Sequence, residues 1–191
     1  MSRSDDIRAA ALELFTRRGY EATTMADIGA AVGIRGPSLY KHVASKQELL
    51  AQIMTTTMEE LLALHRTAVV GVDDPTERLR RATEAHVRYH ARHRLEAFVG
   101  NREIRSLTEP HRDRVLALRA EYERRFRELV NDGVAAGRFH VTSARLASFA
   151  ILDLGMGLSA WYREGGELSE DAVVWQYSDF ALRLVGALPH P

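Results

Sequence analysis

The fold is decided by one stretch near the N-terminus, residues 24–50, which reads TMADIGAAVGIRGPSLYKHVASKQELL. Thr24 is a typical N-cap residue for a helix, and Gly33, nine residues later, interrupts that helix. Pro37 suits the first turn of a second short helix, and Ser45 can cap a third. Two short helices joined by a tight glycine turn predict a helix-turn-helix, which presents a small helix end to the major groove of DNA.

A recognition helix needs small residues at its N-terminus, so that its backbone can approach base edges. Arg35 is the candidate for bidentate contact with guanine, and Lys41 is a candidate for contact with phosphate. The residues expected to contact DNA are Thr24, Arg35, Gly36, Pro37, Ser38, Tyr40, Lys41, His42 and Lys46. An ordinary helical hairpin with a solvated polar face would show a similar short pattern, so the pattern alone leaves that alternative open.

Composition limits the function classes. The chain has 191 residues, 46% hydrophobic residues, no cysteine and a net charge of zero, which excludes thiolate zinc sites and cysteine nucleophiles. Residues 1–50 contain seven Lys or Arg and six Asp or Glu, a net charge of +1. DNA binding by this segment would therefore depend on a few placed contacts and on two copies of the reader. The sequence has neither a membrane-length apolar run nor a signal-peptide pattern, so we expect no membrane segment and a cytoplasmic location.

Helical periodicity extends along the whole chain, and strand signals are nearly absent. We expect an all-α fold of about nine helices, with Ser4 capping the first. A helix-turn-helix DNA-binding domain would occupy residues 1–50, and an effector-binding and dimerisation domain residues 51–191. The helices expected after the first span about residues 24–32, 36–42, 46–68, 76–94, 108–137, 142–163 and 169–188, with a short segment at 95–106.

The last two predicted helices are apolar over most of their circumference, so each must be buried on more than one side. Gly155 and Gly157 permit close approach of another helix. The economical interpretation is a four-helix interface between two copies, which gives the two readers that a palindromic operator needs. A deeply buried monomer core is the alternative. The predicted interface residues are Leu158, Trp161, Trp175, Phe180 and Leu184.

Three motifs carry a family resemblance: FTRRGYEATT at 15–24, DIGAAVGI at 27–34 and LYKHVASKQELL at 39–50. Residues 7–50 closely resemble the DNA-binding domain of the TetR family of transcriptional repressors. Ala26 departs from the pattern, because many members have a positive or polar residue there. The resemblance implies a homodimeric repressor that binds a double-stranded DNA operator and is released by a small-molecule effector.

The resemblance also implies an effector cavity between the fifth to eighth helices. The segment WYREGGELS at 161–169 resembles a pattern in TetR members that sense acyl-CoA thioesters, although Glu164 replaces its proline. An acyl-CoA thioester is therefore one candidate effector, and no cofactor is expected. The inward-facing positions predicted to line the cavity are His86, Tyr89, Phe98, Tyr122, Phe126, Phe149, Leu152 and Met156.

A second ligand chemistry is open. His86, His90 and His93 have i, i+4, i+7 spacing on one helix face, which could bring imidazoles to a zinc or nickel ion in a metal-responsive regulator. The arginines on the same helix disfavour a cation, so we do not assign a metal site. The sequence contains no nucleophile elbow, phosphate-binding loop or H-E-x-x-H motif, and we expect no catalytic residues and no enzyme activity.

Overall fold

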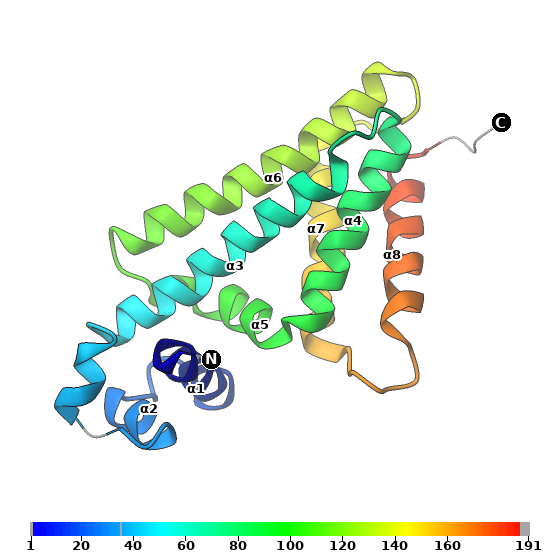
Figure 1. Ribbon diagram of the computed structural model, residues 1–191. Coiled ribbons are helices and arrows are strands. Elements are labelled where there is room, and N and C mark those ends of the chain that lie inside the picture. Colours follow the sequence, from blue (N-terminus) through cyan, green and yellow to red (C-terminus); the bar gives the residue numbers. More distant parts are fainter. Residues whose placement is uncertain (1, 35, 188–191) are drawn as a thin grey trace. The chain divides into compact units, whose positions relative to one another are not determined.

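The computed structural model describes residues 2–34 and 36–187 of the chain. Within these residues it contains eight α-helices and two short 3-10 helices and no strand, which confirms the all-α prediction (Figure 1). The elements are α1 (Arg3–Arg18), α2 (Met25–Ala31), η1 (Gly36–Lys41), α3 (Lys46–Val69), α4 (Pro75–Arg92), α5 (Arg94–Glu103), η2 (Ile104–Ser106), α6 (His111–Ala135), α7 (Ala144–Trp161) and α8 (Glu170–Leu184).

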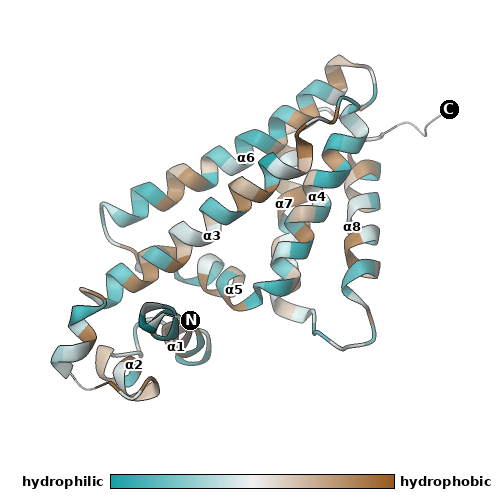
Figure 2. Cartoon of the chain, in the orientation of Figure 1, coloured by the Kyte–Doolittle hydropathy of each residue, from teal (hydrophilic) through white to brown (hydrophobic). Residues whose placement is uncertain are grey.

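The chain forms two compact units. One contains residues 1–58 and 95–118, and the other contains residues 59–94 and 119–191. Helices α3 and α6 each contribute residues to both units. The boundaries of the compact units thus differ from the predicted boundary at residue 50 between the DNA-binding domain and the effector-binding domain. That functional division stays a prediction. Along α3 and α6, hydrophobic and hydrophilic residues alternate in the manner of amphipathic helices (Figure 2).

The first unit is organised by helix caps around a small apolar core. Thr24 accepts a hydrogen bond from the backbone N–H of Asp27, whose carboxylate accepts one from the N–H of Thr24 in return, so the predicted cap of α2 is confirmed. Gly33 has a φ of +68°, a conformation that glycine adopts without a steric cost, and it ends the helix as predicted. Phe15 and Ile28 are fully buried in the core of this unit.

Two local predictions differ from the structure. The first helix is capped by Ser2 rather than Ser4, because Asp5 completes a capping box with Ser2. The predicted recognition helix is a 3-10 helix of six residues, η1, rather than an α-helix. The short segment expected at residues 95–106 forms α5 and η2.

The second unit is built around α4, which packs against both α7 and α8 (Figure 1). Asp74 caps α4 and Pro75 occupies its first turn, where a missing N–H has no cost. Leu79 and Val87 of α4 are fully buried, and the opposite face of the helix bears arginines. The amphipathic pattern of α4 therefore directs one face into the core of this unit.

Candidate DNA-binding and effector sites

The predicted reader surface is exposed on η1. Leu39 is buried and anchors the element, while the side chain of Tyr40 is 56% exposed. The other exposed reader residues that the structure describes on and just after η1 are Gly36, Pro37, Ser38, Lys41 and His42. This combination of a small N-terminal end, a phenol, an imidazole and one ammonium suits contacts with base edges and phosphates. Arg35 lies outside the described residues.

Two of the predicted DNA contacts make bonds within the protein. The hydroxyl of Thr24 donates to the carboxylate of Asp27 over 2.6 Å. The Nζ atom of Lys46 donates to the carbonyl oxygens of Tyr20 and Thr23 over 2.8 and 2.9 Å, and it lies 4.1 Å from the centroid of the Tyr20 ring. Lys46 therefore ties the start of α3 to the turn after α1. Lys41 is left as the exposed lysine on the reader.

A groove of about 630 Å³ lies beside η1. Ala26 and Ala30 of α2 form one part of its wall, and Tyr40 lies on η1. None of the lining residues that the structure describes is charged. The groove therefore provides shape and apolar contact, and electrostatic contact must come from residues around it.

The second unit contains a buried cluster of polar and aromatic side chains. We call it the histidine cluster, and it consists of His65, His86, His90, Tyr122 and Phe126. The rings of His86 and His90 meet edge to face with centroids 4.5 Å apart, and Phe126 lies 5.2 Å from His65 and 5.7 Å from His86. The three histidine side chains are each at most 4% exposed.

His86 is held in one tautomer. Its Nε2 lies 2.9 Å from the carbonyl oxygen of Leu152, which only accepts hydrogen bonds, so Nε2 carries the proton. Burial lowers the pKa of His86 to about 4, so the ring is neutral and its Nδ1 accepts from the hydroxyl of Tyr122 over 3.1 Å. Burial also raises the pKa of Tyr122 well above its usual range, which keeps that hydroxyl protonated.

Gly155 of α7 makes this arrangement possible. A Cβ atom at that position would lie 2.3 Å from the Cδ2 atom of His86 and 2.4 Å from its Nε2. The close approach predicted for this glycine is therefore an approach to α4 within one protomer. No atom outside its own helix lies within 4 Å of a Cβ at Gly157, so that glycine meets no such neighbour in the described chain.

The other two histidines have unsatisfied hydrogen-bonding groups. Both ring nitrogens of His65 and both of His90 are buried and lack hydrogen-bond partners in the described part of the protein. Burial lowers the pKa of His65 to about 4 and that of His90 well below its usual value, with the neighbouring His86 adding to each shift. A buried polar group without a partner costs about 1–3 kcal/mol, so these nitrogens mark a place where a ligand would be stabilised.

The predicted cavity residues are only partly brought together. His86, Tyr122, Phe126 and the carbonyl of Leu152 meet in the histidine cluster. Tyr89 is buried beside it and donates to Glu60 over 2.7 Å.

Three of these predictions need correction or qualification. Phe98 packs against the core of the other unit, so it is not a cluster residue. Phe149 is 43% exposed and lies under the guanidinium of Arg145, because it is on the outer face of α7. Met156 is half-buried on the same helix. His65 was missed, because nothing local to α3 indicates its proximity to α4 and α6.

The metal alternative is not supported by the geometry. The ring of His93 stacks on Tyr89 with centroids 4.3 Å apart, which separates it from the pair formed by His86 and His90. In residues 2–34 and 36–187, no group of three or more His, Asp or Glu side chains is arranged to hold a metal ion. The i, i+4, i+7 spacing therefore does not produce a convergent ligand set.

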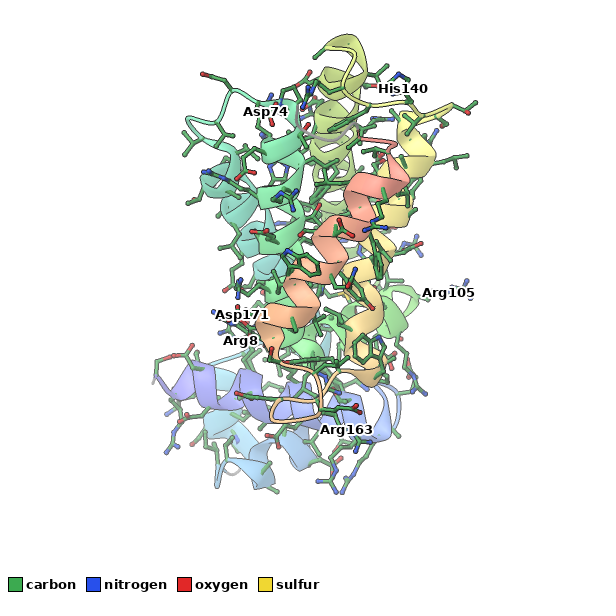
Figure 3. The ribbon with its side chains drawn as sticks, turned by 90° about the vertical axis from the view of Figure 1, so that its right-hand side faces the viewer. Arg8, Asp74, Arg105, His140, Arg163 and Asp171 are labelled. Atoms are coloured by element: carbon green, nitrogen blue, oxygen red, sulfur yellow. The ribbon has the colours of Figure 1, made fainter. Side chains whose placement is uncertain are left out.

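Helices α7 and α8 expose large apolar side chains. Trp161, Trp175, Phe180 and Leu184 are between 40% and 60% exposed. Leu158 is fully buried in the core formed with Val87 and Val173, so its prediction as an interface residue was wrong. It faces inward because it lies on the side of α7 that packs on α4. Figure 3 views this side of the molecule, with α8 in the foreground and Asp171 near its start.

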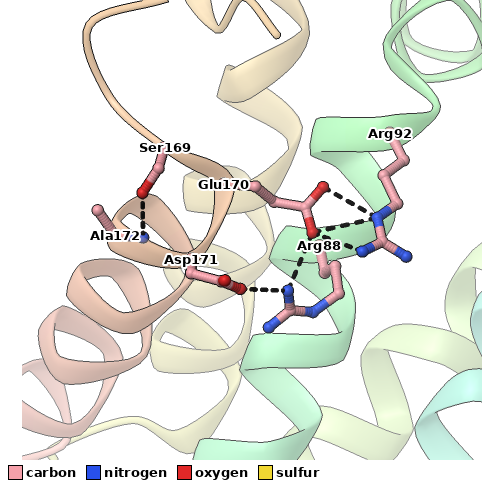
Figure 4. Close-up of polar contacts among 6 residues, drawn as sticks. All are labelled: Arg88, Arg92, Ser169, Glu170, Asp171 and Ala172. Carbon is pink, nitrogen blue, oxygen red and sulfur yellow. Dashed lines mark hydrogen bonds and ion pairs between the residues drawn. The ribbon is translucent and has the colours of Figure 1, made fainter. Parts of the chain in front are cut away.

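An ion-pair network joins the outer face of α4 to the start of α8 (Figure 4). Arg88 contacts Glu170 over 2.9 Å and Asp171 over 2.8 Å, and Arg92 contacts Glu170 over 2.7 Å. Hydrogen bonds from Arg92 are the main cause that lowers the pKa of Glu170. Because α4 carries His86 on its other side, one helix contacts both the histidine cluster and α8.

Comparisons with known proteins agree for both parts of the chain. Residues 7–53 match the model of bacterial regulatory proteins of the tetR family, and residues 72–185 match that of the tetracyclin repressor-like C-terminal domain. The HTH-type transcriptional repressor KstR2 of Mycobacterium tuberculosis (strain CDC 1551 / Oshkosh) is 29% identical over 178 residues, which cover 92% of this chain and 89% of that protein.

Solved structures show the same relationship. A bacterial regulatory protein of the tetR family from Rhodococcus RHA1 superposes with a TM-score of 0.91 and 31% identity, covering 99% of this chain and 100% of that one. No helix in the described residues is long and apolar enough to cross a membrane. The two family models and the shared all-helical fold show that this chain belongs to the TetR family of DNA-binding transcriptional regulators.

Proposed function

We propose that this regulator is a homodimeric repressor that binds a palindromic operator and is released when a small-molecule effector occupies the histidine cluster. The observation that carries the effector part is the set of unpartnered, buried ring nitrogens on His65 and His90. The KstR2 relatives are repressors by name, which supports repression as the default activity.

The exposed apolar face of α7 and α8 supports the dimer. Trp175 is 60% exposed and Phe180 is 44% exposed, and aromatic side chains of this size are seldom left in water without a partner. Two copies joined through this face would provide two readers. A dimer of this kind recognises half-sites in successive major grooves, about 34–36 Å apart.

Helix α4 is the element through which the effector would act. It holds His86 and His90 on its buried face and Arg88 and Arg92 on the face that contacts α8. A ligand that displaces the histidine rings would shift α4 and, through the ion pairs, the start of α8. A changed dimer geometry would move the two readers out of register with the operator.

Acyl-CoA thioesters are the first effector class to test. The structure of AibR, determined in complex with isovaleryl coenzyme A and operator DNA, shares this fold with a TM-score of 0.84 and 24% identity. A thioester has a carbonyl oxygen that could accept a hydrogen bond from a neutral imidazole, and an acyl chain that aromatic rings could surround.

The test is a gel-shift titration of the protein on DNA from its own upstream region. We expect isovaleryl-CoA or octanoyl-CoA to release the DNA, and His90→Leu to require at least about tenfold more ligand, since a hydrogen bond is lost. Arg81→Gln, an exposed change on the same helix, is the matched control. Release by the free acids but by no thioester would refute the acyl-CoA class, and release by no small molecule from a metabolite panel would refute the effector mechanism.

A further inference from the structure

The second unit has a cleft of about 410 Å³ formed by the end of α3, the start of α4 and the second half of α6. We call it the arginine cleft. Its charged and titratable lining residues are His65, Arg66, Arg78, Arg125, Glu128 and Asp132. All of them belong to the same compact unit, so the cleft is a feature of that unit alone.

The three guanidinium groups of the cleft differ in how far they are neutralised. Arg78 contacts Asp132 over 2.9 Å, and Arg125 contacts Glu121 over 2.8 Å. Arg66 is exposed, and its guanidinium has no ion pair or hydrogen bond with the described residues. Glu128 pairs with Arg124. The charge of the Arg66 guanidinium is therefore not neutralised by a carboxylate. An incoming anion could share Arg78 and Arg125 with the carboxylates that already contact them.

His65 forms part of the cleft and gives it a buried polar end. It is 4% exposed, and neither ring nitrogen has a partner in the described chain. Its ring also lies edge-on to Phe126 and Tyr122, with centroids 5.2 and 6.2 Å away. His65 thus belongs to the histidine cluster and also lines the arginine cleft. The positive charges of Arg125 and Arg78 help to lower the pKa of its imidazole, which keeps the ring neutral.

We propose that the arginine cleft binds a phosphate or carboxylate group of the effector, with Arg66 and Arg125 as its cationic partners and His65 as a hydrogen-bonding partner. The proposal rests on the proposed function in one respect, namely that the occupant is the effector. The effector would then be an amphipathic anion. Its charged group would lie in the arginine cleft and its apolar part among the rings of Tyr122 and Phe126.

Geometry favours arginine for this task. A guanidinium can donate two parallel hydrogen bonds to the oxygens of a phosphate or carboxylate, and such charge-assisted bonds are about twice as strong as neutral ones. Arg78 pairs with Asp132 and Arg125 pairs with Glu121. All four of these side chains are at least 29% exposed. Exposed pairs of this kind contribute little to stability, so an anionic ligand can compete for these cations.

The direct test titrates the full-length protein with inorganic pyrophosphate and, separately, with octanoate at low ionic strength. Binding is followed by the imidazole NMR signals of His65, which are assigned by their loss in His65→Gln. We expect at least one anion to shift these signals saturably and its affinity to fall about tenfold in Arg66→Gln and in Arg125→Gln. Arg81→Gln is the matched control, because it removes an arginine of α4 that does not line the cleft.

A gain-of-affinity variant separates binding from stability. Asp132→Asn removes a carboxylate that lines the cleft and repels an anion, so it should tighten binding of the same anion several-fold. Response to pyrophosphate alone identifies phosphate as the recognised group, and response to octanoate alone identifies a carboxylate. The proposal is overturned if neither anion shifts the His65 signals, or if Arg66→Gln and Arg125→Gln bind as tightly as the parent.

Release of operator DNA is measured in parallel, so the two proposals can fail separately. Anion binding that depends on Arg66 and Arg125, together with operator release by no small molecule, would leave the cleft assigned and overturn the effector mechanism. Operator release by an acyl-CoA that is equally effective on both arginine variants would support the mechanism and overturn the cleft.

Discussion

The ammonium of Lys46 lies 2.8 Å from the carbonyl oxygen of Tyr20, in the turn that follows the first helix. A second bond of 2.9 Å to the carbonyl of Thr23 gives the same ammonium two backbone acceptors. The lysine that the motif places among the DNA contacts is therefore also a structural tie within the DNA-binding region.

Replacing Lys46 by methionine should destabilise the protein. The variant Lys46→Met keeps the length of the side chain but leaves two carbonyl oxygens without a donor, which should lower the free energy of unfolding by about 2 kcal/mol. Urea denaturation followed by circular dichroism measures the change. Lys41→Met is the matched control and should stay within about 0.5 kcal/mol of the parent, because Lys41 is exposed. Equal stability of the two variants would contradict the structural role of Lys46.

Lys41, in contrast to Lys46, should contribute to DNA binding by contacting a phosphate. A lysine that neutralises one phosphate contributes about 0.9 to the slope of log affinity against log salt concentration. With one Lys41 in each copy of a dimer, Lys41→Met should lower the slope by about 2. Fluorescence anisotropy with labelled operator DNA at four or more salt concentrations measures it. An unchanged slope with normal operator affinity would mean that Lys41 does not contact phosphate.

The sequence predicted the local structure around η1 better than the long-range packing of the histidine cluster, for a physical reason. Caps such as Thr24 with Asp27, and breaks such as Gly33, act over three or four residues and can be recognised without knowing the fold. The histidine cluster joins α3, α4, α6 and α7 over long sequence separations. His65 joins it only because α3 passes beside α6, which no local pattern encodes. Leu158 was misplaced for the same reason, since both sides of an apolar helix look alike in sequence.

The buried histidines should make stability depend on pH. The pKa values of His65 and His86 fall to about 4 in the folded protein, below the usual value of 6.5. Between these two values the unfolded chain binds more protons than the folded one, so stability is full above about pH 6.5 and falls as the pH is lowered toward 4. We expect a loss of about 2 kcal/mol per histidine between pH 7 and pH 5. Denaturation at several pH values should show a smaller loss in His65→Gln. An equal loss would show that His65 does not titrate in this way.

The dimer should depend on the exposed aromatic residues of α8. Trp175 is 60% exposed in the single chain, and Trp175→Arg would place a charge at the centre of the proposed apolar interface. Light scattering coupled to size exclusion should then show a monomer, with operator affinity reduced by more than about a hundredfold because two readers no longer bind together. Leu64→Arg changes another exposed apolar residue, on α3, and should leave the dimer intact. A dimeric Trp175→Arg would place the interface elsewhere.

The two glycines of α7 provide the sharpest test of the histidine cluster, because the same substitution should have opposite effects at positions two residues apart. At Gly155 a Cβ would lie 2.3 Å from the ring of His86, so Gly155→Ala must displace the imidazole from the carbonyl of Leu152. The overlap and the lost hydrogen bond should cost about 1–3 kcal/mol. At Gly157 no atom outside its own helix lies within 4 Å of the added Cβ in the described chain, and alanine is the better helix former by about 1 kcal/mol. Chemical denaturation should therefore rank Gly157→Ala as equal to or above the parent and Gly155→Ala below it. If Gly155→Ala were as stable as Gly157→Ala, the close packing of α7 on His86 would be wrong, and with it the tautomer assigned to that ring.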